Sequence, residues 1–114
     1  MKTIMLGVAL VIIFSSCTIR SHPMDMTQAV QSARTRADHE RLAKHYEDAA
    51  RQMEAKAAEH EKLRIQYERY RGMYSRDAQN LIDHCQRLLR AYEQAVEENF
   101  AMAKSHRLLA AGAN

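Results

Sequence analysis

Apolar side chains recur at alternating intervals of three and four residues over most of the chain. This heptad spacing is typical of helices that pack side by side along a line of contact, called the seam below. In the first half, the predicted seam contains His39, Leu42, Tyr46, Ala49, Met53, Lys56, His60, Leu63, Tyr67, Tyr70 and Tyr74. In the second half, it contains Ala78, Leu81, Cys85, Leu88, Tyr92, Ala95, Asn99, Met102, His106 and Leu109. The pattern predicts two long helices.

Residues that break helices are scarce and lie where the two helices would begin and end. The 114-residue chain contains one Pro and three Gly, and its abundant Ala, Glu, Arg and Leu favour helix over strand. Pro23 disfavours helix before it, and Gly72 and Gly112 suit positions just after helix ends. Asp25 or Thr27 can cap the first helix, and Ser75 can cap the second. The expected all-α fold is an antiparallel coiled-coil hairpin over residues 25–112, with helices over 25–71 and 76–111 and a turn over 72–75.

A second apolar stripe lies beside the predicted seam. It consists of Ala43, Ala50 and Ala57 in the first helix and of Ile82, Leu89, Val96, Ala103 and Ala110 in the second. Three apolar positions in each heptad form a wider face than two helices need to cover each other. We therefore expect the hairpin to self-associate, most simply as a homodimeric four-helix bundle.

Residues 1–16 have the features of a secretory signal peptide. Lys2 provides a positive charge near the start, and residues 4–14 form an apolar run, IMLGVALVIIF. This run is too short to cross a bilayer, which takes about 20 residues, and its length fits the core of a secretory signal. The run ends in the sequence FSSC, whose cysteine is Cys17.

The FSSC sequence resembles the lipobox of bacterial lipoproteins, whose cysteine is acylated, typically with palmitate, and becomes the mature N-terminus. The resemblance implies that Cys17 is lipidated and that residues 17–24 are a tether. Thr18 is not acidic, which is similar to lipoproteins sorted to the outer membrane, so the helices would face the periplasm. An ordinary cleaved signal, or an uncleaved anchor, is the alternative interpretation.

The helical part is also similar to small proteobacterial helical lipoproteins that have no assigned function. The similarity is carried by H-x-x-L…Y-E-x-A…H blocks, here HERLAKHYEDA and SHRLLA. It implies a cell-envelope protein and implies no activity.

Polar residues with metal-binding side chains fall on the predicted seam. If the turn centres near Gly72, His39 faces His106 and His60 faces Cys85, while His84 adjoins the second layer. Neutral imidazole and thiolate are ligands for Zn or Cu, and dimerisation would bring four ligands to each layer. The other interpretation is that these residues are polar core layers that fix register and oligomeric state.

Three tyrosines fall on the seam close to the predicted turn, namely Tyr67, Tyr70 and Tyr74. They can fill the tip of the hairpin while their hydroxyl groups stay in water. Alternatively, they form an exposed aromatic cluster that binds an envelope partner.

Charge and motifs exclude several classes of function. The formal charge is +3, but basic and acidic residues alternate along the chain, so nucleic-acid binding is not expected. No Glu-x-x-His, His-Glu-x-x-His or Cys-x-x-Cys motif occurs, so we expect no enzyme and no resident cofactor. The sequence predicts an envelope-anchored helical lipoprotein with a structural or protein-interaction role. The alternative is a periplasmic metal-binding protein.

Overall fold

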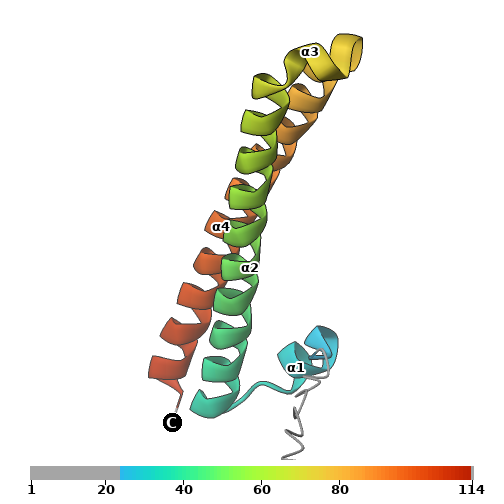
Figure 1. Ribbon diagram of the computed structural model, residues 1–114. Helices are drawn as coiled ribbons and strands as arrows, with labels where there is room; N and C mark the ends of the chain where they lie inside the picture. Colours follow the sequence, from blue (N-terminus) through green and yellow to red (C-terminus); the bar gives the residue numbers. More distant parts are fainter. Residues whose placement is uncertain (1–23, 114) are drawn as a thin grey trace, which may run out of the picture.

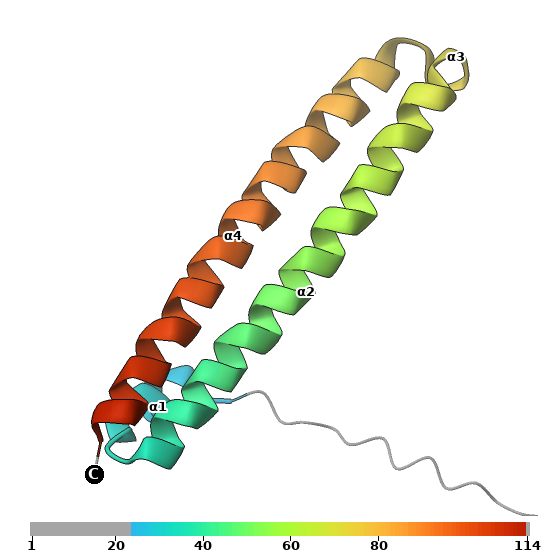
Figure 2. The ribbon, with the colours of Figure 1, turned by 90° about the vertical axis from the view of Figure 1, so that its left-hand side faces the viewer.

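The chain folds into a helical hairpin with one short additional helix. The structure is a computed structural model that describes residues 24–113, and this part contains helices and no strands. Its elements are α1 (Met26–Ser32), α2 (Arg36–Arg69), α3 (Arg71–Tyr74), a 3₁₀ turn (Ser75–Asp77) and α4 (Ala78–Gly112). Helices α2 and α4 run antiparallel and pack against each other along their lengths (Figures 1 and 2). The predicted all-α hairpin is confirmed.

Two predicted features lie outside the described residues, namely the signal peptide over residues 1–16 and the lipidation site Cys17. Within residues 24–113, none of the helices combines the length and the apolar character that crossing a bilayer requires.

The long first helix expected over residues 25–71 is divided into α1 and α2. Thr35 has an extended backbone, and its hydroxyl accepts a hydrogen bond from the Asp38 amide at 3.2 Å. The Asp38 carboxylate in turn accepts from the Thr35 amide at 3.0 Å, which completes a capping box. These backbone and hydroxyl donors hold the pKa of the Asp38 carboxyl well below its usual range. The chain therefore starts a new helix at Arg36, while Asp25 caps α1 by accepting from the Gln28 amide, as expected.

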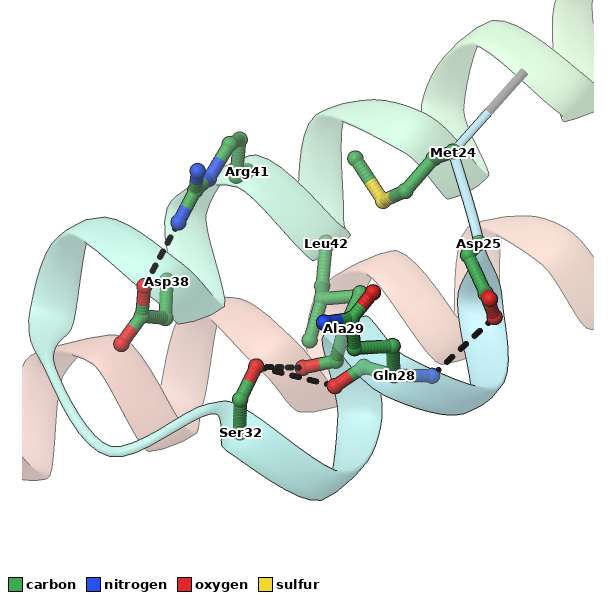
Figure 3. Close-up of a pocket in the computed structure, with 8 residues that line it drawn as sticks. All are labelled: Met24, Asp25, Gln28, Ala29, Ser32, Asp38, Arg41 and Leu42. Atoms are coloured by element: carbon green, nitrogen blue, oxygen red, sulfur yellow. Dashed lines mark hydrogen bonds and ion pairs between the residues drawn. The ribbon is translucent and has the colours of Figure 1, made fainter.

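Helix α1 packs against one broad face of the hairpin, at the end where α4 finishes (Figures 1 and 2). Leu42 points from α2 toward α1 and is almost completely buried (Figure 3). The loop residue Ala33 is also buried. The break before Arg36 lets α1 fold back and cover a leucine that the hairpin alone would leave exposed.

The turn differs from the predicted loop over residues 72–75. Helix α2 ends at Arg69, where the Tyr70 amide still donates to the Gln66 carbonyl at 2.9 Å. Gly72 lies inside α3 without a left-handed backbone, so the turn does not depend on the conformational freedom of glycine. Asp77, rather than Ser75, precedes the first residue of α4, and its side chain makes no capping hydrogen bond. The reversal is built from one helical turn and one 3₁₀ turn.

The observed seam differs from the predicted seam at every second position. Ala50 is 0% exposed and Ile82 is 2% exposed, whereas Leu88, which the sequence pattern assigned to the seam, is 40% exposed. On α2, the residues that turn toward α4 are His39, Ala43, Tyr46, Ala50, Met53, Ala57, His60, Arg64 and Tyr67. On α4, they are Ala78, Ile82, Cys85, Leu89, Tyr92, Val96, Asn99, Ala103, His106 and Ala110.

The observed register has a physical reason. The small side chains of Ala43, Ala50 and Ala103 allow the two helix backbones to approach closely. Each register places one cation in the seam. The predicted register would have placed Lys56 there, whereas the observed register turns Arg64 toward α4, where its guanidinium donates to Glu61 at 2.7 Å. In the structure Lys56 is exposed and pairs with Glu59 at 3.1 Å.

Candidate functional site

Two histidines contact each other across the seam near the open end of the hairpin. His39 lies in the first turns of α2 and His106 in the last turns of α4. Their Nδ1 atoms are 3.2 Å apart, and the rings are 5.4 Å apart with an interplanar angle of 25°. One imidazole must donate to the other, so the two rings hold different tautomers. The two residues face each other, as the register of the predicted hairpin requires.

The surroundings of His106 favour its neutral form. The side chain is 8% exposed, and the ring of Tyr46 stacks on it at 5.7 Å with an interplanar angle of 8°. Burial, and to a smaller extent the proximity of His39, lowers the pKa of His106 below its usual value. Arg107, the residue after His106, donates a hydrogen bond to Glu47, the residue after Tyr46, at 2.8 Å and so links α4 to α2. The histidine pair therefore lies in a fixed and mainly uncharged part of the seam.

The second predicted layer is arranged differently. His60 stacks on Tyr92 at 5.5 Å, and among the residues that the structure describes its buried Nδ1 has no hydrogen-bond partner. Cys85 is buried, and desolvation raises the pKa of its thiol, while the charge of Arg64 opposes this effect. His84 is exposed on the outer side of α4, where its Nδ1 accepts from Arg87 at 3.0 Å. Within residues 24–113, no three His, Cys, Asp or Glu side chains converge as a complete metal site.

The tyrosines near the turn form part of an exposed tip. Tyr67 and Tyr74 meet edge to face, with ring centroids 5.2 Å apart. Tyr70 and Tyr74 are exposed, and so is Met73, which the sequence pattern did not single out. The tip therefore presents both aromatic and apolar surface to solvent.

A larger exposed surface follows from the observed register. We call it the apolar face; it contains Ala49, Leu63, Tyr70, Leu81, Leu88, Ala95, Met102 and Leu109. On α4 these residues recur at seven-residue intervals. On α2 the same spacing places the exposed Lys56 between Ala49 and Leu63, so a charge interrupts this row. Antiparallel packing brings both rows to the same side of the hairpin. Leu42 belongs to the same row as Leu63, so α1 covers one end of this face.

The opposite side of α2 carries an acidic row. It consists of Glu40, Glu47, Glu54, Glu61 and Glu68, also at intervals of seven residues. Glu47 bonds across the hairpin to Arg107, and Glu61 bonds to Arg64 at 2.7 Å. The hairpin thus has one mainly apolar broad side. On the other broad side α2 carries the acidic row, and α4 carries Gln79, Gln86, Glu93, Phe100 and Arg107.

A small hollow lies between α1 and the start of α2 (Figure 3). Its volume is about 210 Å³, and it is lined by Met24, Asp25, Gln28, Ala29, Ser32, Asp38, Arg41 and Leu42. Asp25 and Asp38 are engaged as helix caps, and the Ser32 hydroxyl donates to the Gln28 carbonyl at 2.9 Å. We interpret the hollow as a packing gap beside Leu42.

Comparison with known proteins finds no matching family model, no matching curated protein and no matching solved structure.

Proposed function

We propose that the chain is a lipoprotein of the cell envelope, tethered through Cys17, whose hairpin has a structural or protein-interaction role. The observation that carries this proposal is the apolar face, because Leu88 is 40% exposed and Leu109 is 53% exposed on the side of the hairpin opposite the acidic row of α2. Contiguous apolar surface of this kind is typical of sites that bind another protein. The resemblance of FSSC to a lipobox supports the tether.

A second copy of the chain is the partner that this face fits best. Its two leucine-containing rows have the heptad spacing of helices that pack in bundles, and a second hairpin offers the same spacing. The acidic row lies on the far side, so docking through the apolar face does not bring two rows of glutamates together. In addition, α1 already covers Leu42 in the same way that a partner helix would cover Leu63 and Leu88.

The oligomeric state tests this role. We expect sedimentation equilibrium of the detergent-solubilised chain to give a dimer, and we expect Leu88→Glu to give a monomer that keeps its helicity. The control is Gln94→Glu, which adds the same charge at an exposed position of α4 outside the apolar face. A wild-type chain that stays monomeric at every concentration would contradict self-association.

The tether has its own test. We expect the wild-type protein to incorporate a labelled fatty acid and to fractionate with the outer membrane, and we expect Cys17→Ser to lose both properties. Fatty-acid labelling that persists in Cys17→Ser would contradict acylation at this residue.

Metal binding is the second candidate function. It is favoured by one observation, the 3.2 Å separation of the His39 and His106 Nδ1 atoms.

A further inference from the structure

We propose that His39 and His106 together bind a divalent transition-metal cation such as Zn(II) near the open end of the hairpin. Two ligand nitrogens of a tetrahedral Zn(II), each about 2.0–2.1 Å from the metal, lie about 3.3–3.4 Å apart. The two Nδ1 atoms are 3.2 Å apart and face each other. The distance between the nitrogens therefore needs to change by only about 0.2 Å, and both rings need to rotate so that their Nδ1 lone pairs converge on one cation beside the line that joins the two nitrogens.

The protonation chemistry of the pair suits this exchange. In the metal-free pair, one Nδ1 carries a hydrogen and the other accepts it. Metal binding needs a lone pair on both Nδ1 atoms, so the donor ring moves its hydrogen to Nε2, and a neutral pair releases no net proton. His106 is buried against the ring of Tyr46, and burial favours the neutral imidazole, which is the form that binds a cation.

The surrounding contacts hold the two ligands in place. Tyr46 stacks on His106, and Arg107, the residue after His106, joins the two helices by its ion pair with Glu47. A site whose ligands are already positioned loses less entropy when it binds. The described residues bring no third His, Cys, Asp or Glu to this point, so water completes the coordination. This proposal does not depend on self-association.

The choice of metal follows from the ligands. Imidazole nitrogen suits Zn(II), Ni(II) and Cu(II), whereas Mg(II) and Ca(II) prefer oxygen. We expect thermal unfolding of the chelator-treated full chain in detergent to shift upward with Zn(II). The shift should increase with the logarithm of metal concentration above saturation and should be reversed by a chelator. Mg(II) should leave the unfolding temperature unchanged.

Variants locate the site. His39→Ala and His106→Gln should each remove the Zn(II)-dependent shift, whereas His84→Ala should keep it, because His84 is exposed and lies away from the seam. If either site variant is too unstable for a melt, NMR of the wild-type imidazole nitrogens replaces it. Zn(II) should then move the Nδ1 resonances of His39 and His106 and leave a hydrogen on each Nε2.

Two results would overturn the proposal. One is an unfolding temperature that Zn(II) does not raise, which would leave the pair as a hydrogen bond between rings. The other is a metal response that survives in both site variants, or nitrogen shifts confined to His45 and His84. Sedimentation of the metal-free chain is a separate measurement, so failure of the metal site is distinguishable from failure of self-association.

Discussion

The observed seam predicts which apolar residues of α4 stabilise the hairpin. Ile82 is 2% exposed, and Ile82→Ala removes three methyl or methylene groups, each worth about 0.8 kcal/mol when buried. The transfer cost is therefore about 2.4 kcal/mol, and the cavity left behind brings the total into the range of about 2–5 kcal/mol. Leu88 is 40% exposed, so Leu88→Ala should cost at most about 1.4 kcal/mol in the isolated hairpin.

The assay is urea unfolding followed by helicity, at a protein concentration low enough to keep the chain monomeric. Low concentration matters because a partner on the apolar face would bury Leu88 and add to its apparent contribution. We expect Ile82→Ala to lower the free energy of unfolding by at least about 1 kcal/mol more than Leu88→Ala does. Equal losses, or a larger loss for Leu88→Ala, would mean that the seam runs through Leu88, as the sequence pattern alone predicted.

Three other predictions follow from the caps and the buried polar groups. Thr35→Ala should cost about 1 kcal/mol in urea unfolding because it removes the capping box of α2, and Thr35→Ser should restore most of the loss. Iodoacetamide should alkylate Cys85 much more slowly in the folded chain than in the unfolded chain, as followed by mass spectrometry. The reason is that burial raises the pKa of the thiol and blocks access of the reagent. Equal alkylation rates in the two states would contradict this prediction. Stability should be greatest above about pH 6.5 and should fall as pH decreases through the depressed pKa of His106, because the unfolded chain then binds more protons. A flat profile of unfolding free energy between about pH 7.5 and 5 would contradict the last prediction.

The fold was predictable because its largest determinants are periodic. Apolar spacing and the near absence of Pro and Gly predict two long helices. A chain of this length can bury the apolar sides of both helices by folding back on itself. The register was not predictable to the same degree, since Leu88 and Leu89 are both apolar, as are Leu81 and Ile82. The stripe that contains Ala43, Ala50 and Ala103 forms the seam, because small side chains let the two helix backbones approach closely. This effect depends on how the two helices fit together and not on the sequence of either helix alone.

The division of the first helix has a local signal in the sequence. Thr35 and Asp38 have the spacing of a capping box, but they lie inside a stretch without Pro or Gly, where a continuous helix costs little. The gain that favours the break is tertiary, since folding back α1 buries Leu42 and Ala33.

The candidate site was predictable in part because residues seven apart stay on one side of a helix. His39 and His106 lie in the seam whichever of the two apolar stripes forms the rest of it, and they meet in the structure. His60 stacks on Tyr92, one heptad beyond Cys85 on α4, just as His106 stacks on Tyr46, one heptad beyond His39 on α2. The apolar pattern does not specify which of two residues one heptad apart a ring stacks on.

The position of the histidines connects the apolar face with the chemistry of the seam. On a helical wheel, His39 and His106 lie between the buried alanine rows and the rows of the apolar face. A second chain that covers the apolar face near Met102 and Leu109 would therefore exclude water from the histidine pair as well. Exclusion of water disfavours imidazolium, and by linkage protonation disfavours association to the same extent. Self-association and the neutral form of His106 should thus support each other, and both should weaken as the pH falls below about 6.5.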